Sequence, residues 1–167
     1  IIILAQDITI NENFKKNFKE FNFYAKTINT YIDLNSFLVV FSQVNIGSIK
    51  KYFGNLHINK KIVLSYSPNV LTIGESLKSI KSQKLILLGI FNIQQLPINK
   101  LILFFKNNFK KIQISDISVA ELAKEATQIK LAMDVTFNNI IHNISFKYNI
   151  DYDSLTNYLK NDTRFSK

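Results

Sequence analysis

The sequence contains no cysteine and no tryptophan, and it has only two prolines, four glycines and two histidines among 167 residues. Without cysteine the chain can form no disulfide and no thiolate metal site, and it offers no cysteine nucleophile. The histidines, His57 and His142, are far apart in the sequence and match no metal-ligand spacing, so we expect no metal site. Each is expected to be a surface residue or a hydrogen-bonded core residue.

Long apolar runs and targeting signals are also missing. No run of apolar residues reaches the roughly 18 residues that a membrane-spanning helix needs, and no charged start with a cleavage site marks a signal peptide. We therefore expect no membrane partner and a cytoplasmic location. The first residue is Ile1, inside the apolar run "IIILA", which is typical of a buried strand. The simplest explanation is that the chain is a piece of a longer protein.

The net charge of +9 raises the question of a nucleic-acid partner. The lysines are scattered and fall at the ends of apolar runs, and no RNA-recognition or zinc-finger pattern accompanies them. Lysine, asparagine and isoleucine are the residues that an AT-rich coding sequence favours. Because the lysines are scattered and no nucleic-acid-binding motif accompanies them, we expect no nucleic-acid partner.

The first part of the chain alternates between strand-like and helix-like segments. All four glycines and both prolines lie within the first hundred residues. Five short apolar runs occur within residues 1–115, at 1–5, 36–41, 61–66, 84–89 and 111–115. Helical segments are predicted between them, at about 12–31, 47–54, 74–80 and 95–108. Mostly solid apolar strands that alternate with helices predict an α/β domain over residues 1–115, with a mostly parallel sheet of about five strands covered by helices on both faces.

The last part of the chain is predicted to be helical. A helical period runs from Ile117 to about Tyr148, and Asp116 or Ser118 can cap its first turn. Such a helix is roughly 48 Å long at about 1.5 Å per residue, which exceeds a small domain. We therefore expect residues 116–167 to be a helical region in which the segment 117–148 pairs with a second copy of the chain. The apolar stripe expected to make this contact is Leu122, Ile129, Met133, Phe137 and Ile140.

A polar stripe shares this long helix. Glu121, Lys124 and Gln128 are spaced at i, i+3 and i+7, which places them on one face. Two interpretations are open. Lys124 and Gln128 either face solvent, as most polar helix stripes do, or line a site that something covers.

Several short motifs, taken in order, resemble those of the UDP-glucose/GDP-mannose dehydrogenase family. The family's Ser-Thr-Val-Pro-x-Gly is similar to "SQVNIG", and its Pro-Glu-Phe-Leu-x-Glu-Gly is similar to "PNVLTIG". Of the family's Asp-Arg-x-x-x-Gly, the segment "KLILLG" keeps only Gly89. The family's Ala-Glu-x-x-Lys-x-x-x-Asn is similar to "AELAKEATQ", its Phe-x-Asn to "FNN", and its Asp-x-Arg to "NDTRFSK". The positions that match are Ser42, Val44, Gly47, Pro68, Leu71, Gly74, Gly89, Ala120, Glu121, Lys124, Phe137, Asn139, Asp162 and Arg164.

This resemblance implies a fold and a function. Residues 1–115 would be the second part of a Rossmann-like NAD-binding domain, and residues 116–167 an incomplete central dimerisation domain. The family oxidises the hexose CH₂OH of a nucleotide sugar, here a UDP-hexose, to a carboxylate by two successive hydride transfers to NAD. The implied site residues are Lys124, Gln128 and Asn69 for catalysis, Val70, Leu71 and Arg164 for substrate binding, and Ser42 and Gln43 for cofactor binding.

The chain also departs from the family pattern. The glutamate that serves as a base in the family is Asn69, which accepts no proton at ordinary pH, the second glutamate is Ile73, and the threonine of the first motif is Gln43. The family's nucleophilic cysteine would follow Lys167, and its glycine-rich phosphate loop would precede Ile1. The alternatives are a diverged, non-catalytic relative that binds a sugar nucleotide or acts as a dimerising structural module, and a basic α/β interaction module unrelated to the family.

Overall fold

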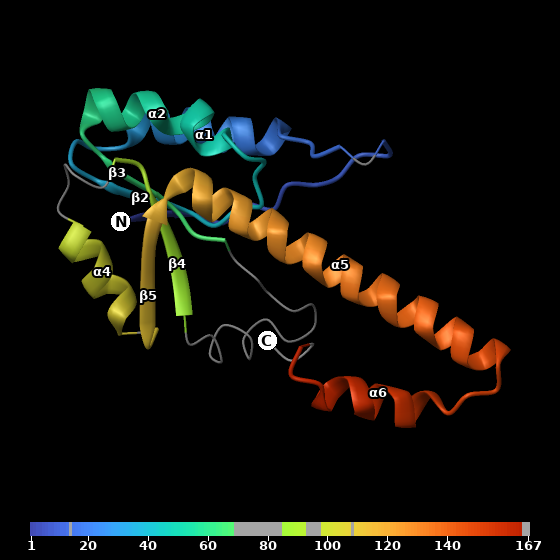
Figure 1. Ribbon diagram of the computed structural model, residues 1–167. Helices are drawn as coiled ribbons and strands as arrows, with labels where there is room; N and C mark the ends of the chain where they lie inside the picture. The colour runs from blue at the N-terminus through green and yellow to red at the C-terminus, as the bar shows by residue number, and fades with distance from the viewer. Residues whose placement is uncertain (14, 69–84, 93–97, 108, 165–167) are drawn as a thin grey trace. The chain divides into compact units, whose positions relative to one another are not determined.

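Five strands form one sheet, in the spatial order β1-β2-β3-β4-β5 (Figure 1). The computed structural model describes residues 1–13, 15–68, 85–92, 98–107 and 109–164. The strands are β1 (Ile2–Leu4), β2 (Phe37–Val40), β3 (Val63–Tyr66), β4 (Leu85–Ile90) and β5 (Lys111–Asp116). The helices are α1 (Lys19–Tyr31), α2 (Ser48–Lys60), α4 (Ile98–Lys106), α5 (Ile117–Lys147) and α6 (Tyr152–Asn161).

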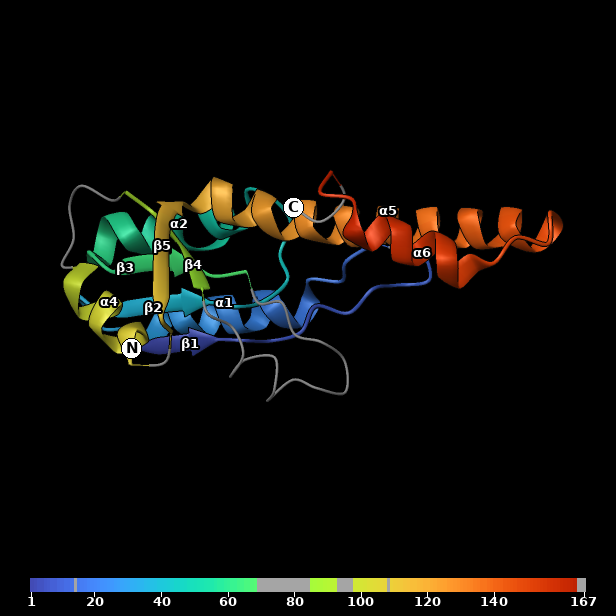
Figure 2. The ribbon, with the colours of Figure 1, turned by 60° about the horizontal axis from the view of Figure 1, so that its bottom comes forward.

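The sheet is mostly parallel, as predicted, with one exception. β1, β2 and β3 run in the same direction (Figure 2), and so do β4 and β5. β3 and β4 pair antiparallel, with Ser65 opposite Ile90 and Tyr66 opposite Gly89. The apolar pattern did not indicate this antiparallel pair, because a strand covered on both faces has the same apolar composition in either direction.

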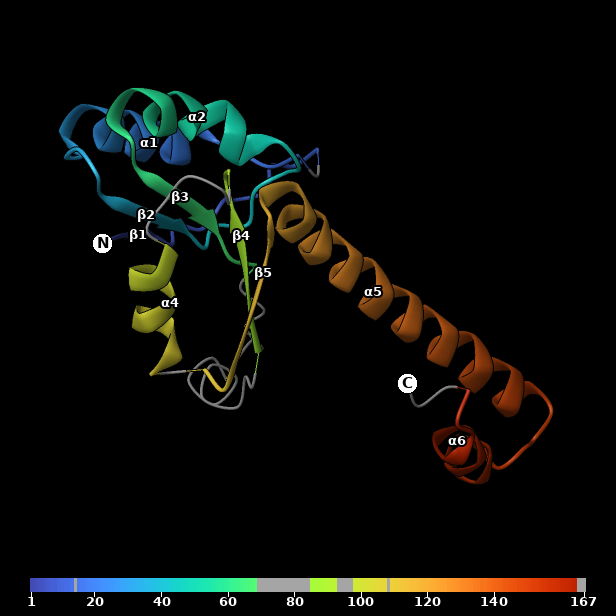
Figure 3. The same ribbon diagram turned by 60° about the vertical axis from the view of Figure 1, so that its left-hand side comes forward.

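Helices cover both faces of the sheet, which explains the solid apolar strands. α1 and α2 lie on one face and α4 lies on the other (Figure 3). Successive strand residues point to opposite faces, so Leu38 and Val40 enter the core beneath α1 and α2 while Val39 enters the core beneath α4. The largest contributions from the helices to these two cores are Phe21, Ile49, Phe53, Leu101 and Phe105.

Two helix boundaries differ from the sequence-based expectation for identifiable reasons. α1 begins at Lys19 and not near residue 12, because the side chain of Asn11 accepts hydrogen bonds from the backbone N–H groups of Asn13 and Lys15 and so forms a turn there. α2 continues six residues past Gly54 to Lys60, since a single glycine inside a helix weakens it without ending it. The predicted helix at 74–80 lies outside the described residues.

The long helix α5 agrees closely with its predicted range, and the cap is Asp116, whose Oδ1 accepts from the backbone N–H of Ser118 at 2.8 Å. The chain divides into two compact units inside this helix, Ile1–Glu125 and Ala126–Lys167. In the second unit α6 begins at an Asp151 cap that accepts from Asp153 N–H. Among the described residues no helix is both long and apolar enough to cross a membrane.

The start of α5 packs directly on β4 at a glycine. A Cβ added at Gly89 would lie 2.6 Å from Ala120 Cβ and 2.9 Å from the backbone Cα of Ile117, so neither neighbour can yield without moving the helix. We predict that Gly89→Ala lowers the free energy of unfolding by about 1–3 kcal/mol, the usual cost of overpacking a core. Chemical denaturation measures this change.

Gly54 provides the matched control, because it lies inside α2 and a Cβ there meets nothing closer than Lys50 Cγ at 3.7 Å. Gly54→Ala is expected to raise the free energy of unfolding by about 0.5–1 kcal/mol, since alanine loses less backbone entropy than glycine in a helix. Equal effects of the two substitutions would contradict the close packing of α5 on β4.

Candidate functional site

The loop that follows β2 is held by a carboxylate from α5. Gly47 takes a left-handed conformation, with φ of 83°, and directly precedes the first turn of α2. Its N–H donates to Glu121 Oε2 at 2.7 Å, and the N–H of Ile49 donates to Glu121 Oε1 at 3.0 Å. Glu121 is only 1% exposed. The unpaired amides of a helix N-terminus and its partial positive charge are therefore satisfied from within the protein.

Lys124 lies one turn further along α5 on the same side as Glu121. Its side chain is only 5% exposed, although lysine is rarely buried in folded proteins. Burial lowers the pKa of Lys124; the negative charge of Glu125 opposes this effect and the positive charge of Lys16 adds to it. A buried lysine with a lowered pKa beside a strand-end loop is the kind of group that functional sites contain.

A second carboxylate of α5 is engaged by the segment that precedes α1. Lys16 Nζ donates to Glu125 Oε1 at 3.0 Å and to the carbonyl oxygen of Val44 at 3.4 Å. This ion pair borders a cleft of about 810 Å³ within the first unit. The residues that line the cleft are Lys15, Lys16, Phe18, Asn45, Ile46 and Glu125.

Two buried hydroxyl groups complete this region at the carboxyl ends of β2 and β3. Ser42 Oγ is buried and has no hydrogen-bond partner within the described part of the chain. Tyr66 is fully buried, and burial raises the pKa of its hydroxyl, with the carboxylates of Glu121 and Glu125 adding to the effect. In α/β sheets ligands bind outside the carboxyl ends of parallel strands, so an unpartnered hydroxyl at this edge marks a candidate ligand contact.

The site residues predicted from the sequence differ in exposure and in the compact unit to which they belong. Ser42 and Lys124 are buried in the first unit, while Gln43 in the same loop is exposed. Gln128 and Arg164 belong to the second unit and are exposed, and Arg164 forms a salt bridge with Asp162. The predicted residues Asn69, Val70 and Leu71 lie outside the described residues.

The three residues of the polar stripe of α5 differ in exposure. Glu121 and Lys124 are buried, whereas Gln128 is exposed. Sequence reasoning gave Glu121 no site role and did not single out Lys16 or Glu125. The spacing of the stripe was the available signal for Glu121, but its partners lie 72 and 74 positions away.

Both histidines fit the expected structural roles. His57 is buried, with Nδ1 2.9 Å from the carbonyl oxygen of Ile62, and His142 is exposed and packs edge-on against Tyr152. Neither side chain is part of the region around Lys124.

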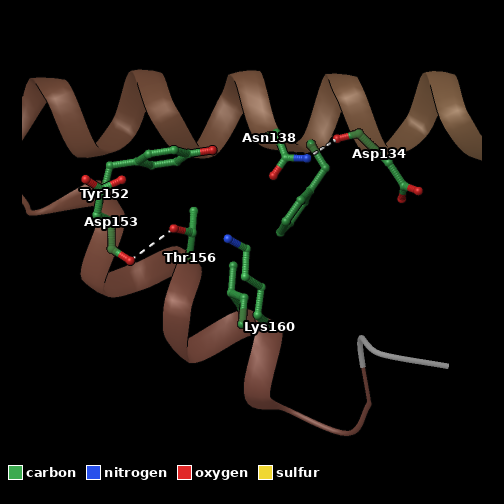
Figure 4. A pocket seen from close by; sticks show the side chains of 8 residues that line it. Asp134, Asn138, Tyr152, Asp153, Thr156 and Lys160 are labelled. Atoms are coloured by element: carbon green, nitrogen blue, oxygen red, sulfur yellow. Dashed lines mark hydrogen bonds between the residues drawn. The ribbon is translucent and has the colours of Figure 1, made fainter. Parts of the chain in front are cut away.

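The second unit has a cleft of its own between α5 and α6 (Figure 4), with a volume of about 650 Å³. Its polar groups bond to their own helices: Asn138 Nδ2 donates to the carbonyl oxygen of Asp134 and Thr156 Oγ1 to that of Asp153. The apolar side chains that line it are Phe137, Tyr152 and Leu159. These features favour a surface that packs against protein over a site for a polar ligand.

Several solved structures with a similar fold are nucleotide-sugar dehydrogenases. A GDP-mannose dehydrogenase from Pseudomonas aeruginosa superposes with a TM-score of 0.82 at 16% identity, and the match covers 96% of this chain. A UDP-D-ManNAc dehydrogenase from Pyrococcus horikoshii gives 0.83 at 12% identity over 97% of the chain, and a UDP-glucose dehydrogenase from Pyrobaculum islandicum gives 0.81 at 16% over 97%. The chain has the fold of these dehydrogenases.

This likeness confirms the resemblance noted in the sequence, together with the α/β fold class of a partial Rossmann-like sheet followed by a long helix. The matches cover 38%, 40% and 39% of the three solved chains, so this chain spans about two fifths of their length. No family model matches the sequence, and no curated protein matches it. At identities this low the likeness establishes the fold alone.

Proposed function

We propose that the chain is part of an NAD-dependent nucleotide-sugar dehydrogenase that acts in the cytoplasm and oxidises the hexose CH₂OH of a UDP-sugar to a carboxylate. The observation that carries the proposal is the burial of Lys124, one turn along α5 from the Glu121 that holds the loop after β2. The shared fold of GDP-mannose, UDP-D-ManNAc and UDP-glucose dehydrogenases supports the substrate class.

Lys124 has the chemistry that the reaction requires. When a primary alcohol is oxidised, a C–H bond breaks with its electron pair and the hydroxyl group loses its proton, so negative charge develops on the oxygen. A buried ammonium stabilises this charge more strongly than an exposed one, because little water surrounds it. Gln128, one turn further along α5, is the proposed group that holds the same oxygen through its amide. Asn69 is the third proposed catalytic position, and Val70, Leu71 and Arg164 are the proposed sugar-nucleotide contacts.

The loop after β2 fits a contact to NAD, which when bound accepts the hydride from the substrate. Ser42 Oγ is buried without a described hydrogen-bond partner and can bond to a polar group of the cofactor. Gln43, exposed in the same loop, is a second proposed contact. The N-terminus of α2 is not available for the cofactor phosphates, because Glu121 already accepts from its amides.

Binding of nucleotide sugars tests the substrate class directly. The protein expressed from its complete reading frame is titrated by calorimetry with UDP-glucose, GDP-mannose, UDP-N-acetylmannosamine and, as a control, UDP. Tighter binding of at least one sugar nucleotide than of its nucleoside diphosphate supports the proposal. Equal affinity for UDP and every UDP-sugar, with no binding of GDP-mannose, would count against it.

The second unit favours an additional proposal, a homodimer formed through the helix at about 117–148. Ser145 is the sole buried residue among the described residues 126–164, and the apolar side chains of this part of α5 are exposed on more than one side. A helix that is apolar around most of its circumference is normally covered. The exposed set is Ile129, Leu131, Met133, Val135, Phe137, Ile140, Ile144 and Phe146. If the protein is instead a diverged relative without activity, the same helix would still make it a dimerising module.

A charge placed in the apolar stripe is expected to prevent this association. Met133 is 62% exposed, and Met133→Asp would bury a carboxylate at the interface, so the dimer dissociation constant should rise on the order of 100-fold. Asn55→Asp adds the same charge at an exposed position of α2, outside the proposed interface, and should leave the dimer intact. Sedimentation velocity at micromolar concentration measures both, and a wild-type monomer would rule out the dimer.

A further inference from the structure

Lys16 connects three parts of the first unit that are far apart in the sequence. It precedes α1, whereas Val44 belongs to the loop after β2 and Glu125 is on α5, directly after Lys124. Its ammonium bonds to both Val44 O and Glu125 Oε1. Because both charged side chains are half-buried, solvent screens this ion pair less than it screens a surface pair.

The charges around Lys124 come from several elements. α5 contributes the carboxylate of Glu125 and the segment before α1 contributes Lys16, while Glu121 and Glu125 both act on the hydroxyl of Tyr66 in β3. Glu121 is already bonded to two amides of α2, and Glu125 is bonded to Lys16. The carboxylate next to Lys124 is therefore compensated by a cation from another part of the fold.

We propose that Lys16 is a positioning residue for Lys124. It holds Glu125 against the loop after β2 and so sets the charge beside the Lys124 ammonium. While Lys16 is in place it compensates the carboxylate, and the proton on Lys124 is bound less tightly. The role of Lys124 in a reaction rests on the proposed function. The effect of the Lys16–Glu125 contact on Lys124 can be tested without it.

Two substitutions should shift the titration of Lys124 in opposite directions. Lys16→Met removes a positive charge and leaves Glu125 uncompensated, so the pKa of Lys124 should rise. Glu125→Gln removes the negative charge and keeps the size of the side chain, so the pKa of Lys124 should fall. Lys16→Arg preserves the ion pair and should restore the wild-type titration, and Lys15→Met removes the adjacent exposed lysine and should change nothing.

The measurement is a pH titration of the Cε signal of Lys124 by NMR, in protein labelled at this carbon of lysine. The signal is assigned by its absence from Lys124→Met, and circular dichroism checks that each variant is folded. An unchanged or lowered midpoint in Lys16→Met overturns the inference. If that variant does not fold, Glu125→Gln decides alone, and an unchanged or raised midpoint overturns it.

The titration separates this inference from the proposed function. Opposite shifts in a protein that binds no nucleotide sugar would overturn the function and support the positioning role. Binding of a nucleotide sugar without these shifts would support the function and overturn the positioning role.

Discussion

Replacing Lys124 with methionine is expected to lower kcat on the order of 100-fold or more, with a much smaller change in KM. The ammonium acts on charge that grows in the transition state, so its loss affects turnover more than binding. The comparison requires the protein expressed from its complete reading frame, assayed with NAD and the nucleotide sugar that it binds. Initial rates over a range of sugar concentrations separate the two constants.

The same variant distinguishes a chemical role from a structural one. Lys124 is 5% exposed, so its replacement can also change the stability of the fold, and denaturation must accompany the rate measurement. A chemical role predicts that turnover is lost in Lys124→Met protein that circular dichroism shows to be folded. The matched control is Lys130→Met. Lys130 lies further along α5, is exposed and pairs with Asp134, so this variant should keep full activity. A stable Lys124→Met protein with wild-type turnover would show that Lys124 has no part in the reaction.

Glu121→Gln is expected to lower the free energy of unfolding by about 1.5–3 kcal/mol, the range for losing a buried hydrogen bond to a charged group. The carboxylate accepts from both Gly47 and Ile49. A glutamine keeps one acceptor oxygen but turns an NH₂ group toward the other amide, which leaves a buried donor without a partner. The favourable interaction of a negative charge with the N-terminus of α2 is lost as well.

Glu12→Gln is the control for this substitution, because Glu12 is exposed and the change in charge is the same. Its effect should stay within about 0.5 kcal/mol, as is usual at the surface. Urea denaturation followed by circular dichroism compares the two variants. Equal stability of Glu121→Gln and wild type would contradict the role of Glu121 as the cap of α2.

The sequence motifs that suggested the fold are explained by contacts between them. Gly47 donates to Glu121, and Gly89 leaves room for Ala120, so matched residues from three motifs meet at the start of α5. These positions are therefore explained by packing and hydrogen bonding without any role in chemistry.

The sequence predicted the strands and helices that depend on local patterns. It missed the strand pairing and the side-chain contacts that join distant parts of the chain. The apolar runs located all five strands, and the 3.6-residue period located α5 almost to the residue. The antiparallel pairing of β3 with β4 could not be predicted, because the composition of a strand carries no direction. The contact of Lys16 with Glu125 spans 109 positions, and one lysine among many gave no signal for it.

Formation of NADH tests the central proposal most directly. The protein expressed from its complete reading frame is mixed with NAD and each nucleotide sugar of the panel, and absorbance of NADH is followed for wild type and Lys124→Met side by side. The proposal predicts NADH formation with a UDP-sugar in wild type and its near loss in the variant. A folded wild-type protein that forms no NADH with any sugar of the panel, or a Lys124→Met variant that forms it at the wild-type rate, would contradict the account.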